Sequence, residues 1–488
     1  MDFLARAADA LWNPWLLGLF LVTGLVYSVG SGWFQLFGFR IWWRSTAGSL
    51  FQRRKQEDRG LSPLQALATA LASTMGTGSI AGVATALTLG GPGAVFWMWV
   101  SALLGMMTSC GEKLLAVKYQ RAGPDGQLRG GPMYYIRDGL GSPLLAACFC
   151  LACIPATLAG GNLVQSSSIA SGLEAVCGLP RLPVGLAVTL LAGLVMVGGL
   201  GRIAAVSSAL VPAMALLYLG SGTAVLLVNW ERVPQALGLI FSCALSPAAA
   251  AGGGAGWTVS AALRYGVARG VFTNEAGLGT SAMAHGAAQA DHPARQGMWG
   301  VFEVFLSTLV VCTVTALAIL ASGVWDPRSP GGLTGAPLTA AAFRSVLGSF
   351  GQGAVTLSLL LFAFSSILGW SYYGQQCLEF LSGNRLLPAY RTVFLLCTFA
   401  GAVWSPQAIW QLVDLCNALM ALPNLAALLF LAPQALSLLR QWKQSAARKK
   451  TENFKALKME KTIDSRSKCA YHKDRNRSQI QIKRSDTL

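Results

Sequence analysis

Apolar residues form long runs along most of the chain, and short polar segments separate them. A run of about 20 such residues is long enough for an α-helix to cross the hydrocarbon layer of a membrane. The runs lie near residues 15–38, 64–88, 93–118, 143–173, 183–200, 205–229, 250–284, 298–322, 352–378, 389–404 and 409–437. This pattern predicts an all-α polytopic membrane protein with about 11 transmembrane helices.

Small residues interrupt two of these runs. The first break is GTGS at residues 76–79, and the second is PAAAAGGGAG at residues 247–256. A break inside a bilayer frees backbone groups that find no water there, so it survives where it lines a polar cavity. The two breaks indicate a transporter whose substrate site lies between them. The alternative, glycines that only permit tight helix crossings, remains open at this point.

The positions of the breaks predict an internal repeat. They belong to the second and seventh spans. Counting from each break gives two halves of five spans, 2–6 and 7–11. Because five is an odd number, the second half is inverted relative to the first. We therefore expect residues 1–60 to form an N-terminal transmembrane helix and a basic cytoplasmic loop. Residues 61–230 form the first five-helix repeat, residues 231–438 the second, inverted repeat, and residues 439–488 a basic, disordered cytoplasmic tail.

Charge sets the expected orientation. Only 12% of residues are charged, against about 25% in soluble domains. Basic residues concentrate in the cytoplasmic loops of membrane proteins, which predicts an inner (plasma) membrane location with the N-terminus outside and the C-terminus in the cytoplasm. The expected inner loops hold Arg40, Arg44, Arg53, Arg54, Lys55, Arg59, Lys113, Lys118, Arg121, Arg129, Arg137, Arg202, Arg264, Arg269, Arg295, Arg385 and Arg391.

The tail carries most of the net charge of +17. A basic tail beside a membrane helix is typical of a solvated segment, and it can also attract anionic lipid headgroups. No folded nucleic-acid reader accompanies it, so we expect membrane lipids and not nucleic acid as its partners. Cys150 and Cys153 have the spacing of a metal or redox pair, but they lie in an uncharged run and are expected to be packing residues.

Several blocks resemble the alanine/glycine:cation symporter family, the sodium–alanine symporters. The blocks are GTGSIAGVATALTLGG (76–91), GGPGAVFWMWVSALLG (90–105), RGGPMYYIRDGLG (129–141), GVARGVFTNEAGLGTSAMAH (266–285), LTGAPLT (333–339) and LFAFSSILGWSYYGQQ (361–376). The resemblance covers nearly the whole membrane region and implies one N-terminal helix followed by a 5+5 inverted-repeat sodium-coupled amino-acid transporter core. That agrees with the count of spans.

A zwitterionic substrate needs partners for its carboxylate and its ammonium group. The backbone N–H groups of Thr77, Gly78 and Ser79 begin a half-helix and suit a carboxylate. The resemblance implies that the remaining substrate contacts come from three other spans: Gln165, Gly254, Trp257, Thr258, Ser366 and Trp370. Asn162, one turn from Gln165, either orients it or holds helices together.

Sodium prefers oxygen ligands. Ser365 and Ser366 offer two hydroxyl groups, and similar transporters hold their ion at carbonyls that correspond to Ala72, Met75 and Phe362. The alternative is that both serines bond back to carbonyls one turn earlier. Sodium is the coupling ion in this interpretation, and no cofactor is expected.

The chain departs from the family pattern beside the first break. Ser79 stands where the family usually has asparagine, and Thr74-Met75 stand where it has arginine-valine. Charges within the spans are expected to form structural pairs, Glu112 with Lys113 and Glu275 with Arg269, or to act as a gate at Glu275. Glu303 and Asp414 are further candidates for structural pairs or for proton carriers.

These features predict a secondary active transporter that imports small neutral amino acids, alanine and also glycine, by sodium symport with alternating access. It is expected to work as a monomer. The alternative within transporters is a proton-coupled or uncoupled carrier of the same substrates. A channel and a membrane enzyme are disfavoured, since the spans show neither filter-like loops nor a catalytic constellation.

Overall fold

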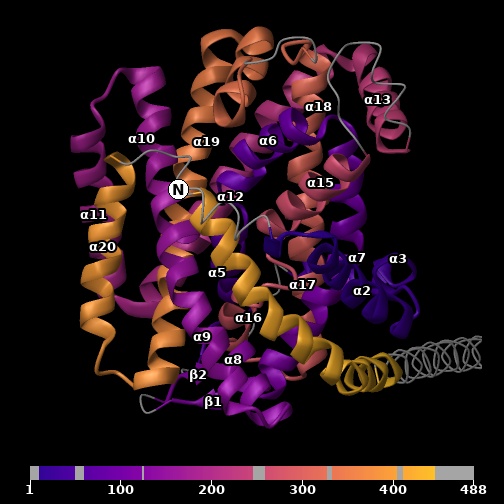
Figure 1. Ribbon diagram of the computed structural model, residues 1–488, viewed down its shortest axis with the longest axis vertical. Helices are drawn as coiled ribbons and strands as arrows, with labels where there is room; N and C mark the ends of the chain where they lie inside the picture. Colours follow the sequence, from indigo (N-terminus) through magenta and orange to yellow (C-terminus); the bar gives the residue numbers. More distant parts are fainter. Residues whose placement is uncertain are drawn as a thin grey trace, which may run out of the picture. The chain divides into compact units, whose positions relative to one another are not determined.

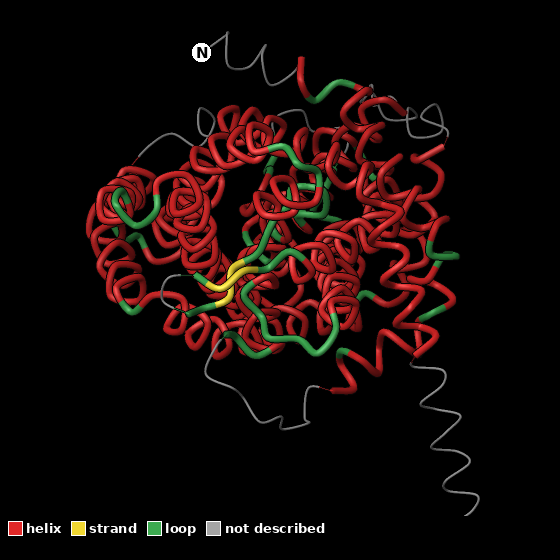
Figure 2. Tube along the Cα trace, turned by 90° about the horizontal axis from the view of Figure 1, so that it is seen from below, coloured by secondary structure: helices red, strands yellow, loops and turns green. Residues whose placement is uncertain are grey.

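The computed structural model describes residues 10–49, 60–123, 126–245, 259–326, 332–403 and 410–445. These residues are almost entirely helical (Figures 1 and 2). The described strands are one short antiparallel pair, β1 (Arg121–Ala122) and β2 (Leu128–Arg129), in the loop that follows the third predicted span.

The helices of the first half alternate long spans with short connecting turns. They are α2 (Pro14–Gly30), α3 (Phe34–Phe37), α4 (Phe39–Ser45), η1 (Ala47–Ser49), α5 (Pro63–Thr74), η2 (Thr77–Ser79), α6 (Ala81–Gly90), α7 (Gly93–Lys118), α8 (Pro132–Tyr134), η3 (Tyr135–Gly139), α9 (Pro143–Leu158), η4 (Ala159–Leu163), α10 (Val164–Cys177), α11 (Arg181–Val197) and α12 (Gly199–Val228).

The second half also alternates long helices with short segments. Its helices are η5 (Trp230–Arg232), α13 (Val233–Leu245), α15 (Val259–Asn274), α16 (Thr280–Gly286), α17 (Pro293–Val304), η7 (Phe305–Cys312), α18 (Thr313–Ser322), α19 (Gly335–Ser382), α20 (Leu387–Val403) and a last helix, Trp410–Ser445. The segments η3, η4 and η7 are π-helical.

Each predicted apolar span overlaps a helix, and α7 has the predicted bounds. Within the described ranges, six helices are long and apolar enough to cross a membrane: Gly93–Lys118, Pro143–Cys177, Gly199–Val228, Pro293–Ser322, Gly335–Ser382 and Trp410–Ser445. Four more apolar helices are shorter: Pro14–Gly30, Ala81–Gly90, Arg181–Val197 and Leu387–Val403. The helical multi-pass architecture is thereby confirmed, whereas the number of eleven spans and the inverted repeat stay predictions.

Some boundaries differ from the predicted ones. Helix α19 begins well before residue 352, at Gly335, and a kink at Gly348, whose φ is 62°, separates its first part from the predicted span. The last helix continues to Ser445, past the predicted end at 437. Arg264 and Arg269, which the charge count placed in inner loops, lie within α15, and the orientation of the chain in the membrane stays a prediction. The predicted domain boundaries stay predictions, and the tail from residue 446 lies outside the described residues.

The first predicted break is present. Helix α5 starts with a capping box in which Ser62 and Gln65 bond each other's backbone N–H, and it ends at Thr74. Met75 and Gly76 leave the helical conformation before η2, and α6 then resumes. The buried residues of this segment are mostly small, so neighbouring helices approach it closely.

A second break lies between α15 and α16. Here Glu275, Gly277 and Gly279 have φ of 56°, 93° and 80°, in the left-handed region that a helix cannot continue through. The predicted second break at 247–256 lies outside the described residues, and the observed one falls later in the same predicted span. Helix α5 packs on α16, and α6 packs on α15, so the two broken helices run antiparallel. Their four halves lie in the middle of the view in Figure 1.

Candidate functional site

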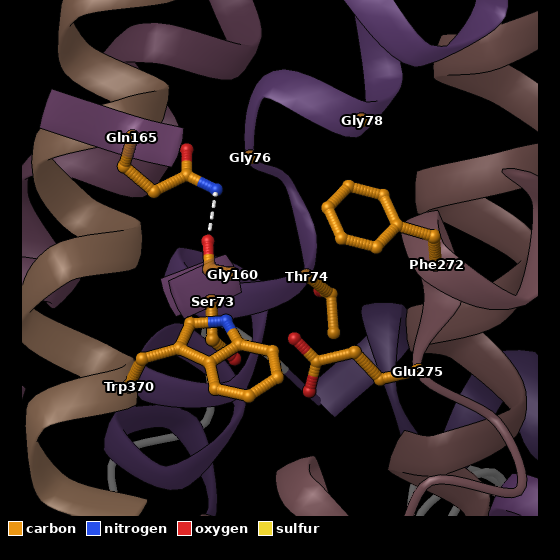
Figure 3. A pocket seen from close by; sticks show the side chains of 9 residues that line it. All are labelled: Ser73, Thr74, Gly76, Gly78, Gly160, Gln165, Phe272, Glu275 and Trp370. Atoms are coloured by element: carbon orange, nitrogen blue, oxygen red, sulfur yellow. Dashed lines mark hydrogen bonds between the residues drawn. The ribbon is translucent and has the colours of Figure 1, made fainter. Parts of the chain in front are cut away.

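A small buried cavity lies where the two breaks meet. Its lining comes from both broken helices, from η4, from α10 and from α19: Ser73, Thr74, Gly76, Gly78, Gly160, Gln165, Phe272, Glu275 and Trp370 (Figure 3). The cavity volume is about 10 Å³, roughly the room that one water molecule needs. A larger ligand therefore enters only after these side chains rearrange.

Three of the residues predicted to contact substrate, Gly78, Gln165 and Trp370, line this cavity. Thr77 and Ser79 flank Gly78 in η2 and are fully buried. The structure therefore brings together five predicted residues that come from three different spans. Three further predicted residues lie outside the described residues: Gly254, Trp257 and Thr258.

Gln165 joins the first break to the π-helical turn η4. Its Oε1 accepts a hydrogen bond from the backbone N–H of Thr77 at 3.4 Å, and its Nε2 donates to the carbonyl of Gly160 at 3.1 Å (Figure 3). A π-helical turn interrupts the regular helical bonding pattern, and such turns are frequent at functional sites. Here the turn supplies the carbonyl that positions the Gln165 amide.

Asn162 has a different role. Its Nδ2 donates to the carbonyl of Phe394 on α20 at 2.6 Å. Of the two roles that the sequence left open, the observed hydrogen bond is the one that holds two helices together.

Two glycines allow the close approaches around the cavity. A Cβ at Gly76 would lie 2.7 Å from Ser366 Oγ, and a Cβ at Gly161 would lie 2.3 Å from the Cβ of Trp370. Both distances are shorter than a carbon atom tolerates, so any side chain at either position displaces its neighbour. The backbone of the first break thus contacts α19 directly, and Trp370 packs on η4.

The predicted sodium ligands lie mostly together. Ser365 Oγ is 3.1 Å from the carbonyl oxygen of Ala72 and 3.0 Å from that of Phe362, and Ser366 Oγ is 3.0 Å from the Ala72 carbonyl. Both hydroxyl groups bond across to α5, and that of Ser365 also bonds back along α19 to the carbonyl of Phe362. The back-bonding alternative is thus observed for Ser365, and sodium binding stays a prediction. Among the hydrogen bonds of the described residues, none joins the carbonyl of Met75 to either serine.

The first break leaves polar groups unsatisfied. In the described part of the chain, Thr77 Oγ1 and Ser79 Oγ are buried without a hydrogen-bond partner. The carbonyl of Ser79 does accept a bond from Thr315 Oγ1 at 2.9 Å. Buried polar groups nearly always have partners, so two orphan hydroxyl groups at one helix break are consistent with a ligand that completes them.

Comparison with known proteins identifies the family. The sequence model of the sodium:alanine symporter family matches residues 1–456 of this chain. The chain belongs to this family. It is 40% identical to the sodium/alanine symporter AgcS of Methanococcus maripaludis, over 90% of this chain and 96% of the relative.

The names of other relatives differ in the substrate that they give. An uncharacterized transporter of Haemophilus influenzae is 43% identical over 88% of this chain and 93% of its own length. A probable sodium/glutamine symporter of Bacillus subtilis, GlnT, is 36% identical over 89% of each chain. The chain therefore belongs to a family of transporters, not of enzymes, and the names of its relatives give different amino acids.

In this symporter-family chain, six cavity residues were not among the predicted substrate contacts: Ser73, Thr74, Gly76, Gly160, Phe272 and Glu275. Three of them carried a signal in the sequence, because Gly76 lies in the predicted first break, Glu275 is a charge inside an apolar span and Thr74 departs from the family pattern. Phe272 carried none, since an aromatic residue in an apolar helix is ordinary.

The predicted pairing of Glu275 with Arg269 is wrong. Thr280 donates its hydroxyl to Glu275 Oε2, whereas Arg269 lies 3.6 Å from a carboxylate oxygen of Asp414. The Arg269 guanidinium also lies 4.9 Å from the ring centre of Trp410, and Trp410 contacts Phe272 edge to face with centroids 5.3 Å apart. The cavity-lining Phe272 is therefore covered by Trp410 and by this ion pair.

The predicted pairing of Glu112 with Lys113 is also wrong. Lys113 Nζ lies 3.0 Å from Glu303 and donates to Ser281 Oγ at 2.7 Å. Glu112 instead accepts from the backbone N–H of Gly277 at 3.0 Å and from Asn424 at 2.8 Å. These two consecutive residues of α7 thus hold the second break and the start of α16.

Proposed function

We propose that this protein is a secondary active transporter that imports small neutral amino acids, alanine and also glycine, by symport with sodium. The observation that carries the proposal is the buried cavity at the crossing of two broken helices. Half-helix ends that face a cavity supply N–H groups and carbonyls to a substrate and its coupling ion. The indole of Trp370 at the cavity wall favours small side chains.

We assign the substrate to groups around this cavity. The N–H groups at Thr77, Gly78 and Ser79 bind the substrate carboxylate, with Gln165 as a polar contact from the opposite wall. Ser366 and Trp370 complete the site from α19, and Trp370 closes the apolar side. Further contacts are assigned by family resemblance alone: Gly254, Trp257 and Thr258.

We assign sodium to the oxygens between α5 and α19. The hydroxyls of Ser365 and Ser366 and the carbonyls of Ala72 and Phe362 support the proposal, because they already lie within 3.0–3.1 Å of one another. Met75 supplies a further carbonyl in this assignment. Sodium acts as the coupling ion, and no cofactor is part of the proposal.

Transport proceeds by alternating access in a monomer embedded in the lipids of the inner membrane. The N-terminus lies outside and the C-terminal tail in the cytoplasm. Because the cavity has room for about one water molecule, the described conformation is closed around it, and rocking of the two predicted repeats opens it to either side in turn.

Uptake of labelled alanine into proteoliposomes tests the proposal. We expect accumulation with an inward sodium gradient, and none with potassium in place of sodium or with a proton gradient alone. Accumulation driven by protons alone would favour the second candidate, a proton-coupled carrier, for which Glu275 at the cavity is the supporting feature. Equilibration without accumulation under every gradient would indicate an uncoupled carrier. If alanine does not enter at all, the substrate assignment is wrong.

A further inference from the structure

Glu275 supplies the carboxylate among the described residues that line the cavity. Its side chain points into the cavity from the second break, on the side away from Gly76 and Gly78 (Figure 3). The residue is 1% exposed. In the described part of the chain, its one side-chain hydrogen bond comes from Thr280, to Oε2. The other carboxylate oxygen therefore remains available to a ligand.

No cation is paired with this carboxylate among the described residues. Lys113, whose charge acts on Glu275, is bound to Glu303 at 3.0 Å, and Arg269 lies beside Asp414. The neutral side chain of Thr74 lies next to Glu275 at the cavity (Figure 3). The charged form of a buried carboxylate is costly without a partner, and a cation that arrives with the ligand would compensate it.

The backbone of Glu275 has an unusual conformation at the cavity. Glu275 has a φ of 56°, which is uncommon for a residue with a side chain. Such conformations persist where surrounding structure enforces them, and they cluster at ligand sites. Here the backbone is held from both sides, because Glu275 N–H bonds the carbonyl of Val271 and its own carbonyl accepts from Leu278.

We propose that Glu275 binds the ammonium group of the amino-acid substrate. The inference rests on the proposed function and adds the one partner that the site otherwise lacks. The N–H groups of η2 take the substrate carboxylate on one side of the cavity, and Glu275 takes the ammonium group on the other. The substrate's two charges are then matched, and a hydroxy acid of the same size is rejected because it leaves Glu275 unpaired.

Competition binding tests this assignment. Purified full-length protein is equilibrated with labelled L-alanine at saturating sodium, and unlabelled L-alanine and L-lactate compete for the site. A hydrogen-bonded charge pair is worth roughly 10- to 100-fold in affinity. We expect Glu275→Gln to weaken alanine binding by roughly that factor and to narrow the preference for alanine over lactate. Glu174→Gln, which removes a surface carboxylate paired with Arg181, is the matched control and should bind as the wild type does.

Each result decides the question. Wild-type affinity and wild-type discrimination in Glu275→Gln would overturn the assignment. If Glu275→Gln does not fold, judged by its melting temperature, Glu275→Asp decides: retained discrimination against lactate supports the assignment, and lost discrimination in a folded protein overturns it. If wild-type protein does not bind alanine, the proposed substrate fails. The same comparison is then made with glycine and glycolate, so the two failures remain distinguishable.

Discussion

Ser365 occupies a position where a single hydroxyl group links two helices. Its Oγ lies within 3.1 Å of the Ala72 carbonyl on α5 and within 3.0 Å of the Phe362 carbonyl on α19. If sodium binds among these oxygens, removal of the hydroxyl removes a ligand. We expect Ser365→Ala to raise the sodium concentration for half-maximal alanine binding roughly tenfold. At saturating sodium, its alanine affinity should match that of the wild type. A sodium titration of labelled alanine binding measures both.

Ser371 provides the matched control for this prediction. It lies on the same helix, and among the described residues its hydroxyl donates only to the carbonyl of Leu368, at 2.7 Å and one turn earlier. Ser371→Ala therefore removes a hydroxyl of the same kind from α19 without touching α5, and its sodium dependence should stay unchanged. Equal sodium dependence in both variants would show that the serine pair does not hold the ion.

At the scale of elements, buried charged side chains connect the short helix α16 to α7 and α17. Lys113 on α7 contacts Ser281 on α16 and Glu303 on α17, and His285 on α16 lies 3.4 Å from Glu303. Lys113, His285 and Glu303 are fully buried. Removing one partner of a buried pair is more destabilising than removing both, because the remaining charge is left without compensation.

We therefore expect Lys113→Met to destabilise the protein by about 3–5 kcal/mol, the usual effect of breaking a buried pair. The double variant Lys113→Met/Glu303→Gln should recover most of the loss, since it removes both charges of this pair and an amide can still bond His285. Melting temperatures of purified protein in detergent measure both effects. A double variant less stable than Lys113→Met would contradict the explanation by an unpaired charge.

The sequence predicted the elements better than the pairs between them. Apolar periodicity located a helix at every span, and glycines located the first break. The charge pairs were wrong because adjacent residues of a helix, such as Glu112 and Lys113, do not face each other. Their actual partners, Gly277 and Glu303, come from segments far along the chain. Only the packing of α7 against α16 and α17 brings those groups together.

At the candidate site, too, the sequence predicted some residues and missed others. Gln165 and Trp370 were found through resemblance, and the structure places both at the cavity. Phe272 and Glu275 were missed as contacts because the break between α15 and α16 has no long glycine run from which it could be predicted. Its glycines, Gly277 and Gly279, alternate with larger residues, and the left-handed Glu275 is invisible to any pattern of hydrophobicity.

For the molecule as a whole, the proposed substrate and ion sites share one element. Ser366 Oγ contacts the carbonyls of Ala72 and Ser73 at the end of α5, and it lies against Gly76 of the first break. Sodium that draws the Ala72 carbonyl toward α19 would therefore order the same backbone whose N–H groups receive the substrate. The two bindings should be coupled through this break.

We expect saturating sodium to tighten alanine binding by a factor in the usual range of about 5–150, and saturating alanine to tighten sodium binding by the same factor, as linkage requires. Equilibrium binding of labelled alanine across sodium concentrations, with labelled sodium in the reverse experiment, measures both. Ser366→Ala should shrink this factor, and Ser371→Ala should not. Alanine affinity that does not respond to sodium would show that the ion and the substrate do not meet at this break.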